Sequence, residues 1–371
     1  LNGQQRRKGA GRIQGSCFWC PARPMAGLDN VDVEINNTDI RIRKLADAIV
    51  DDVTEVYAME DELGRGRFSV VRSALHKKEN ARYAVKVVEN ESLNDLENLE
   101  ALETEIKILR QLNHPYIVTL KEVVTTSHDT YIVMELLSGG ELFNRIVDKG
   151  CFPESEAAAL FAQILLSMEY LHSLSIVHRD VKPENILYVN KGSNDIKLID
   201  FGYAGMWAAD KPLTGLCGTP DYVAPEVLTW YDDDDNGTPY GKGSDLWSLG
   251  VLLYVILSGC SPFSADEEEQ LLKQVAEAKY EFYDNEWKGI SQGAKDLIRR
   301  LLVVDPAQRM TMEQMLEHAW LKDAVDKCRT ETASKLEASA RPATAATLSS
   351  PLVQTDTKSE GKSQGCKCLL L

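Results

Sequence analysis

Apolar residues change their spacing along the chain. Between about residues 57 and 134 they form short runs rich in valine and tyrosine, at residues 68–71, 83–88 and 130–134. Such runs predict β-strands. Between the last two runs, leucine and isoleucine recur at intervals of three and four over residues 96–109, which predicts a single helix.

After Gly139 and Gly140 the pattern becomes helical, with helical apolar spacing over residues 154–174, 244–258 and 291–303. A sheet-rich part followed by a helix-rich part predicts an α+β architecture of two lobes, at about residues 57–135 and 139–321. We expect residues 1–56 to be a flexible extension, because the first 28 are rich in Gly and Arg without periodicity. Residues 322–371 are expected to form a short helix and then a mostly disordered tail.

The charge is unevenly distributed. Of the net charge of −16 over 371 residues, residues 1–28 contribute five basic and no acidic side chains, and residues 322–371 contribute eight basic and six acidic. The body between them therefore carries −23. So acidic a body repels a phosphate backbone, and nucleic acid is not an expected partner. The apolar fraction of 44% excludes a wholly disordered chain.

Eight scattered cysteines without a secretory signal pattern favour a reducing, cytoplasmic compartment. No apolar run reaches the roughly 18 residues of a membrane-spanning helix. Cys17 and Cys20 could bind zinc or act in redox chemistry, but unpaired thiols are favoured because no second pair follows. Residues 232–237 are similar to the first half of a calcium loop, yet the twelfth position is Gly243, so we interpret them as a solvated acidic insertion.

A Gly-x-Gly turn lies between two of the strand-like runs, in a segment that includes Leu63, Gly64, Arg65, Gly66, Phe68 and Val71. Glycines let backbone N–H groups approach phosphates closely. A dinucleotide-binding loop would need a helix next and a third glycine, but strand residues follow and the third position is Ser69. The remaining interpretation is a β-hairpin that covers a nucleotide. Lys86 stands alone in an apolar strand, either snorkelling at an edge or held inward by partners.

Three motifs follow in order: His-Arg-Asp-Val-Lys-Pro-Glu-Asn at residues 178–185, Asp-Phe-Gly at 200–202 and Ala-Pro-Glu at 224–226. Together with the glycine turn and Lys86, this set closely resembles the eukaryotic protein kinase family. The resemblance covers about residues 57–321. It implies a bilobal protein kinase fold, with a β-rich N-lobe and a helical C-lobe, and transfer of phosphate from ATP to a protein hydroxyl.

The resemblance implies a catalytic role for several motif positions. Asp180 would accept the proton of the substrate hydroxyl, and Lys182 would balance the charge of the transferring phosphoryl group. Asn185 and Asp200 would bind Mg²⁺, which bridges phosphate oxygens. Asp245 is similar to the helix aspartate that anchors the catalytic loop in this family.

It also implies an ATP site. Lys86 would bind the α- and β-phosphates and pair with Glu105 rather than Glu103, and the glycine turn would cover the phosphates. In the C-lobe, Glu226 would pair with Arg309. The positions matched to the adenine pocket are apolar walls at Leu63, Val71, Ala84, Met134 and Leu187, and backbone groups at Glu135 and Leu137.

Further residues indicate which kind of kinase this is. At Lys182 and Thr219 the sequence resembles serine/threonine kinases rather than tyrosine kinases. At residues 68–72 and 301–306 it resembles the calcium/calmodulin-dependent protein kinase group. The alternative is an ATP-binding pseudokinase or scaffold, although no catalytic member of the motif set is missing. Glu141 and Glu184 match positions that bind a substrate Arg three residues before the phosphoacceptor, so we expect protein substrates with basic motifs.

Two departures from the family concern regulation. Arg179 is of the type that binds a phosphorylated activation loop, but the matching loop position is Gly215 and the nearest hydroxyl belongs to Thr214. Either Thr214 takes the phosphate in a shifted register, or the loop orders without one. The segment after the catalytic domain mixes acids with bases and has few large apolar residues, so calmodulin is a partner by kinship only.

The chain ends in Cys368-Leu-Leu-Leu, a C-a-a-X sequence that predicts geranylgeranylation. Cys366 could carry a second acyl chain, which matters because one lipid anchors only marginally. A prenyltransferase and a membrane surface would then be partners, and the protein would be peripheral to the membrane. The alternative is a chance cysteine in a disordered tail.

Overall fold

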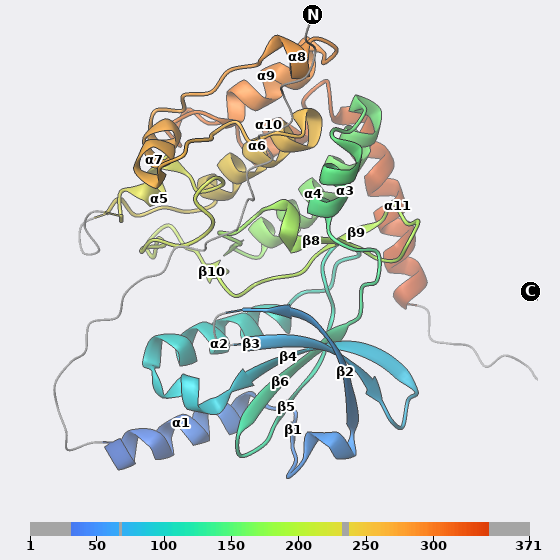
Figure 1. Ribbon diagram of the computed structural model, residues 1–371, viewed down its shortest axis with the longest axis vertical. Coiled ribbons are helices and arrows are strands. Elements are labelled where there is room, and N and C mark those ends of the chain that lie inside the picture. The colour runs from blue at the N-terminus through green and yellow to red at the C-terminus, as the bar shows by residue number, and fades with distance from the viewer. Residues whose placement is uncertain (1–30, 67–68, 232–236, 341–371) are drawn as a thin grey trace, which may run out of the picture.

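The computed structural model describes residues 31–66, 69–231 and 237–340, which form two lobes (Figure 1). One lobe holds a twisted β-sheet with helices at its side, and the other is largely helical. This α+β bilobal arrangement confirms the predicted architecture.

The N-lobe is built on a six-stranded sheet in the order β1-β5-β6-β4-β3-β2, antiparallel except where β1 joins β5 in parallel. Because side chains alternate between faces, Val85 and Val133 pack with Tyr57 on one face, while Val88 and Ile132 belong to the core on the other. The strands are β1 (Ala48–Ile49), β2 (Tyr57–Arg65), β3 (Ser69–His76), β4 (Ala81–Glu89), β5 (Leu120–Thr125) and β6 (Asp129–Glu135).

Helix α2 (Leu96–Leu109) covers the second face of the sheet and matches the predicted helix. Asp95 caps its first turn by accepting hydrogen bonds from the N–H groups of Glu97 and Asn98. Leu99, Leu102, Ile106 and Leu109 are buried on one side of the helix, as the spacing requires. This packing sets the position of Glu105, which lies on the same helix.

The prediction of a flexible extension over residues 1–56 is wrong for residues 31–56. Helix α1 (Val31–Leu45) leads into β1, and a short 3₁₀ turn (Val53–Glu55) precedes β2. Ile42 and Leu45 are buried in the core that includes α2, and Arg41 donates to Glu103 on α2 at 2.8 Å. Among the side chains of α1 that the structure describes, two buried apolar residues three positions apart are too few to produce a clear sequence pattern.

The C-lobe surrounds two long helices, α4 (Glu154–Ser173) and α6 (Gly243–Ser258). Together with α9 (Gln292–Leu301), they confirm the three predicted helices. The other elements are α3 (Leu142–Lys149), α5 (Pro225–Leu228), α7 (Glu268–Ala276), α8 (Asp284–Trp287), α10 (Met312–Leu316), β7 (Ile176–Val177), β8 (Ile186–Tyr188), β9 (Ile196–Leu198), β10 (Gly205–Met206) and the 3₁₀ turns Asn90–Asn94 and Pro183–Asn185.

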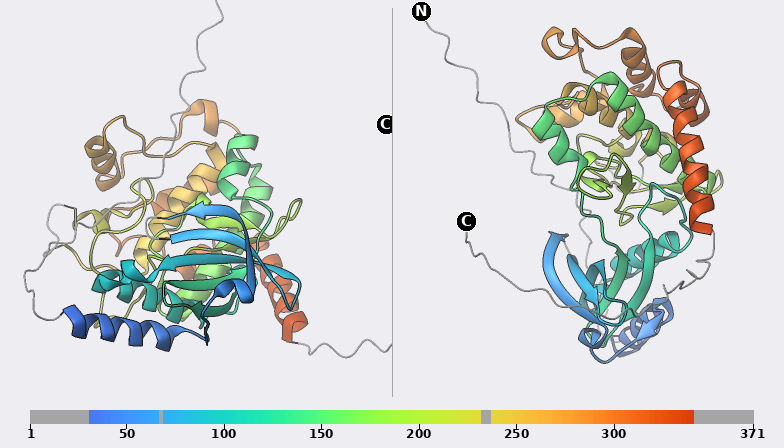
Figure 2. Two further views of the ribbon diagram at one scale, coloured as in Figure 1. Left: turned by 60° about the horizontal axis from the view of Figure 1, so that its bottom comes forward. Right: turned by 90° about the vertical axis from the view of Figure 1, so that its right-hand side faces the viewer.

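A final helix, α11 (Lys322–Ala340), runs beside α4 toward the sheet lobe (Figure 2). Val325 and Cys328 are buried, and Arg329 pairs with Glu169 of α4 at 2.8 Å. The helix expected after residue 321 is therefore present, and it is longer than the short helix predicted and is docked on the C-lobe. The sequence did not predict this docking, because only about one residue per turn of the helix is buried.

Some predictions fall on residues that the structure does not describe. These are Phe68, residues 232–236, Cys17, Cys20, Cys366 and Cys368. Within the described ranges, no helix combines the length and hydropathy needed to span a membrane.

Docking of α11 can be tested with Val325→Asp. Since Val325 is 2% exposed, the substitution buries an unpaired carboxylate, and we expect the free energy of unfolding to fall by about 3 kcal/mol. Asp326→Ala, on the exposed side of the same helix, is the control and should change little. Chemical denaturation of the full chain measures both. Equal stability of the two variants would mean that α11 is not docked.

Candidate active site

The glycine turn joins β2 to β3 at the exposed end of their hairpin. The N–H of Gly66 donates to the carbonyl of Ser69 at 2.8 Å, which closes the turn. A Cβ atom at Gly64 would meet nothing within 4 Å, so this backbone faces open space. Arg65 pairs with Glu62 at 2.8 Å on the surface of the hairpin. The backbone at Gly64 is thus free of side-chain cover, as the approach of a phosphate to a glycine loop requires.

Lys86 on β4 contacts Glu105 on α2, with Nζ 2.6 and 2.8 Å from the two carboxylate oxygens. Glu103, the other candidate, instead accepts a hydrogen bond from Arg41. Burial opposes the charge of Lys86, but the carboxylates of Glu105 and Asp200 outweigh it and raise the pKa of Lys86. The lysine therefore stays protonated, held between the two lobes by acidic partners.

The apolar positions of the expected adenine pocket come from both lobes. Ala84 on β4 stands opposite Met134 on β6, and Val71 on β3 stands opposite Lys86. Leu187 lies on β8 in the C-lobe, where it bridges to Glu141. Leu63 lies near the end of β2 and is 52% exposed.

The connection between the lobes begins at Glu135 and continues through Leu137. The N–H of Glu135 donates to the carbonyl of Thr119 at 3.1 Å, and its carboxylate accepts from Lys197 at 2.5 Å. These bonds fix the start of the connection. Its backbone is therefore held in one place beside the apolar walls.

The catalytic loop gathers four polar side chains. Asp180 accepts a hydrogen bond from the hydroxyl of Thr219 at 2.7 Å and forms an ion pair with Lys182 at 2.9 Å. Lys182 also donates to the Thr219 hydroxyl at 2.7 Å. The amide of Asn185 donates to both the carbonyl and the carboxylate of Asp180. Asp180 is thus held as an acceptor beside a cation, which suits a base that takes a hydroxyl proton.

Asn185 and Asp200 are neighbours through the backbone, because Ile199 donates its N–H to the carbonyl of Asn185 at 3.0 Å. Enclosure opposes ionisation of Asp200, but the charge of Lys86 and the N–H of Gly202 outweigh it and lower its pKa. Asp200 therefore offers an ionised carboxylate, and Asn185 an amide oxygen, since its nitrogen is already used. This oxygen pair fits a hard divalent cation that keeps water and phosphate ligands.

Asp245, in the first turn of α6, fixes the catalytic loop from below. Its carboxylate accepts from the backbone N–H groups of His178 and Arg179, both at 2.9 Å, and contacts Nε2 of His172 at 2.8 Å. Arg179 has a positive φ of 68°, so the loop is strained where the anchor holds it. His172 was missed by sequence reasoning, because a lone histidine at a helix end carries no motif.

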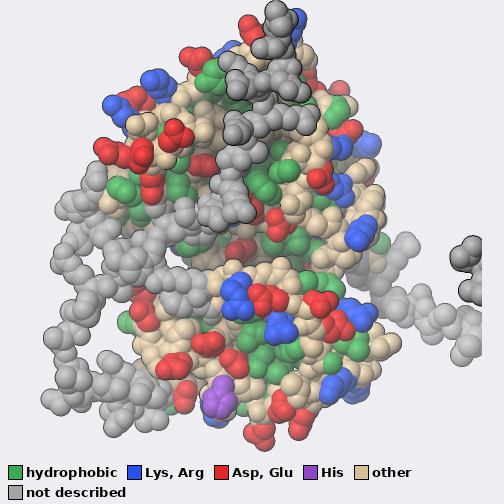
Figure 3. Space-filling model, viewed as in Figure 1, with side chains coloured by type: hydrophobic (Ala, Val, Ile, Leu, Met, Phe, Trp, Pro, Cys, Tyr) green, Lys and Arg blue, Asp and Glu red, His purple; other side chains and the backbone are tan. Residues whose placement is uncertain are grey.

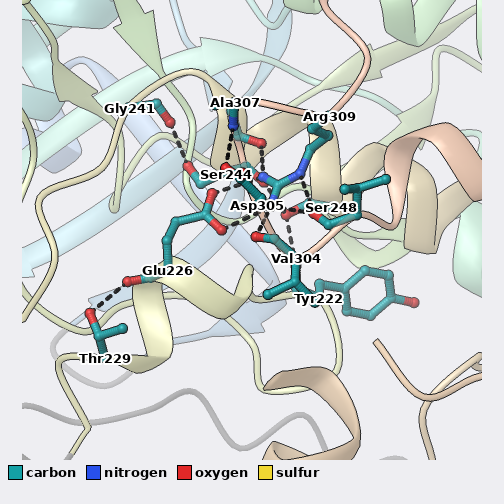
Figure 4. A network of polar contacts seen from close by, with 12 residues as sticks. Tyr222, Glu226, Thr229, Gly241, Ser244, Ser248, Val304, Asp305, Ala307 and Arg309 are labelled. Carbon is teal, nitrogen blue, oxygen red and sulfur yellow. Dashed lines mark hydrogen bonds and ion pairs between the residues drawn. The ribbon is translucent and has the colours of Figure 1, made fainter. Parts of the chain in front are cut away.

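Glu226 and Arg309 form a buried two-point ion pair, at 2.8 and 2.9 Å (Figure 4). Arg309 also donates to the carbonyls of Gly243 and Val303, which ties α5 to the start of α6. The side chain of Arg309 is 0% exposed and that of Glu226 is 6% exposed. The expected partner of Glu226 is thus in place.

Glu184 lies near Asp180 and near a second acidic residue, Glu141. Glu184 has one carboxylate oxygen, Oε2, that is buried without a hydrogen-bond partner among the described residues. Burial raises its pKa and outweighs the nearby charge of Lys182, which lowers it, while the charges of Asp180 and Glu141 also raise it. Burial also raises the pKa of Glu141. A cationic ligand would satisfy both carboxylates.

Arg179 and Thr214 do not meet. Nε of Arg179 donates to the carbonyl of Tyr203 at 2.5 Å, and Nη1 donates to the hydroxyl of Tyr240 at 3.3 Å. The side chain of Thr214 is exposed. Tyr240 was missed by sequence reasoning, since nothing in its local sequence relates it to Arg179.

On the face shown in Figure 3, acidic side chains are spread over both lobes with basic ones between them. No broad basic surface covers this face, as expected for the acidic body.

The geometry described above defines a class of protein: one in which polar groups suited to phosphate transfer lie between a sheet lobe and a helical lobe. The comparisons with known proteins agree. The protein kinase domain family matches residues 57–321, more than half of the chain. The chain therefore belongs to the protein kinase family. It is an enzyme, and the family uses ATP with a divalent metal.

Two relatives narrow the class. The chain is 44% identical over 273 residues to myosin light chain kinase A of Dictyostelium discoideum, covering 73% of this chain and 90% of the relative. It is 42% identical over 272 residues to calcium/calmodulin-dependent protein kinase type 1B of Rattus norvegicus, covering 73% of this chain and 76% of the relative. This chain is thus a eukaryotic serine/threonine kinase of the calmodulin-kinase type.

Arg309→Met tests the buried pair. Removing the cation leaves the Glu226 carboxylate buried without its partner, and we expect the free energy of unfolding to fall by about 3–5 kcal/mol. Arg300→Met is the matched control, because Arg300 pairs with Asp296 on the surface, at 60% and 43% exposure, and should lose almost nothing. Thermal and urea unfolding of the full chain compare them. A loss as small as that of the control would contradict the role assigned to Arg309.

Proposed function

We propose that this kinase transfers the γ-phosphate of Mg²⁺-bound ATP to Ser or Thr residues that follow an Arg by three positions. The observation that carries the preference is the unpaired buried oxygen of Glu184 beside Asp180, with Glu141 next to it. A guanidinium group offers two donors in a fixed plane, which suits a pair of carboxylates. An ammonium group or a neutral side chain would satisfy them less well.

In this proposal the chain's own residues divide the work. Asp180 accepts the proton of the substrate hydroxyl, and Lys182 and Thr219 hold its carboxylate in place. Asn185 and Asp200 hold Mg²⁺, which supplies charge neutralisation on the phosphate oxygens. Lys86, oriented by Glu105, binds the α- and β-phosphates.

The glycine turn, with Gly64, Arg65, Gly66 and Phe68, covers the phosphates in this proposal. The apolar walls enclose adenine, and the backbone at Glu135 and Leu137 binds its edge. Enclosure between the lobes keeps water away from the transferring group.

Asp180→Asn tests catalysis. The amide keeps the shape of the side chain but cannot take a proton, so we expect kcat to fall at least about a hundredfold with nucleotide binding retained. Phosphate transfer from Mg-ATP to an Arg-x-x-Ser peptide measures kcat, and titration with a fluorescent nucleotide measures binding. Transfer by the variant at the wild-type rate would remove Asp180 as the base. ATP binding by the wild type without any transfer would favour the scaffold alternative.

The Arg preference is tested with the same peptide and an Ala-x-x-Ser counterpart. We expect kcat/KM to favour Arg by roughly thirtyfold, and Glu184→Gln or Glu141→Gln to remove most of that ratio. Glu156→Gln changes an exposed carboxylate of α4 and should leave the ratio unchanged. Equal kcat/KM for the two peptides would refute the preference.

A pH series sharpens the same experiment. Only the ionised carboxylates bind the guanidinium, and burial raises the pKa of both. As pH falls toward those raised values, KM should increase for the Arg peptide and stay flat for the Ala peptide. Parallel curves would mean that neither carboxylate binds the Arg.

Two further parts of the proposal concern regulation and location. One relative is named a calcium/calmodulin-dependent kinase, and if calmodulin binds this chain through α11, the helix must first leave α4. If Leu371 ends the protein in the cell, we propose lipidation at Cys368, with a second chain at Cys366. Activity with and without calcium and calmodulin, and the mass of the mature protein, test these two points.

A further inference from the structure

Arg179 lies next to Asp180 in the catalytic loop, and its side chain contacts residues far from it in the sequence. Nε donates to the carbonyl of Tyr203, and Nη1 donates to the hydroxyl of Tyr240. Burial opposes the charge of the guanidinium, but polar neighbours, among them Cys217 and Tyr240, outweigh it and raise the pKa of Arg179. A buried cation beside the catalytic aspartate is therefore bound in part by a phenol.

Tyr240 joins that cation to the activation segment, which we define as residues 213–219. Its hydroxyl donates to the carbonyl of Gly215 at 2.9 Å and lies 3.5 Å from Sγ of Cys217. Its backbone N–H and C=O exchange hydrogen bonds with Leu213, both at 2.9 Å. Tyr240 is only 5% exposed, and burial raises its pKa, so the hydroxyl keeps its proton and remains a donor.

The same segment then reaches Asp180. A Cβ atom at Gly218 would lie 2.7 Å from the carbonyl oxygen of Arg179, so the segment passes directly against the catalytic loop. The next residue, Thr219, donates its hydroxyl to Asp180 at 2.7 Å. The Tyr240 hydroxyl bonds four residues before Thr219, and this contact fixes the approach of the segment to the base.

The position matched to the family's loop phosphate is Gly215, which has no hydroxyl and a φ of 83°. Thr214, the neighbouring residue with a hydroxyl, is exposed, whereas the guanidinium of Arg179 donates to Tyr203 and Tyr240. A phosphate would link Arg179 to the segment through charge. Here an uncharged phenol already makes that link.

We propose that Tyr240 is a positioning residue for phosphate transfer, which ties Arg179 to the activation segment and makes the kinase active without phosphate on Thr214. Because the hydroxyl acts through Arg179 and Gly215 rather than on substrate, its loss should lower kcat and leave KM for ATP nearly unchanged. The geometry thus favours the second of the two alternatives for this loop.

Tyr240→Phe in the full chain, treated with phosphatase and checked by intact mass, tests the proposal. The variant keeps the ring and the backbone pairing with Leu213, and kcat should fall roughly tenfold. Tyr254→Phe is the matched control: its hydroxyl, on α6, donates to the carbonyl of Glu281 at 2.7 Å. The control should lose similar thermal stability and keep its kcat. Unchanged kcat in Tyr240→Phe would overturn the proposal.

A double-mutant cycle separates positioning from stability. Arg179→Ala should lower kcat, and adding Tyr240→Phe should lower it no further, since the phenol acts through the guanidinium. Additive losses would mean that Tyr240 acts elsewhere. Thr214→Ala, and phosphatase treatment of the wild type, should each leave kcat unchanged. If either abolishes activity, the proposal fails, and this comparison holds even if Tyr240→Phe does not fold.

Discussion

A single buried carboxylate holds the catalytic loop in place. Asp245 is 0% exposed and receives hydrogen bonds from the backbone of His178 and Arg179, with His172 as a third partner. Burial by itself would raise its pKa, but these partners lower it, so the group remains ionised. One side chain thereby joins α4, α6 and the residue before Asp180, and the contacts of Asp180 depend on it.

The C-lobe uses buried charge elsewhere too, at Glu226 with Arg309 and at Arg179. Buried ion pairs add little net stability compared with apolar packing, because desolvation offsets the attraction. Their geometry, however, tolerates little displacement, since each lost contact leaves a charge unpaired. In this kinase they lie around the loops rather than inside the long helices, where apolar packing already fixes position. Buried charge thus holds those segments that have too few apolar residues to form a core.

Much of the fold followed from the sequence because the signals were periodic or dense. The valine-rich strands and helices α2, α4, α6 and α9 have several apolar residues at regular intervals. The motif residues around Asp180 were identifiable from their order alone. Helix α1 was not predicted, and α11 was expected only as a short helix, since each docks through a narrow stripe of buried residues. Tyr240 was not either, because it lies 61 residues from Arg179 and only the fold brings the two together.

Helix α11 has a structural consequence beyond its own docking. Cys328 lies 3.4 Å from the hydroxyl of Tyr116, and Lys335 lies over the ring of the same tyrosine and pairs with Asp195. The carbonyl of Tyr116 accepts the N–H of Leu198 at 3.0 Å, two residues before Asp200. The chain that follows the catalytic domain therefore supports the strand that leads to Asp200. The position of that aspartate depends on residues well outside the motifs that identify the family.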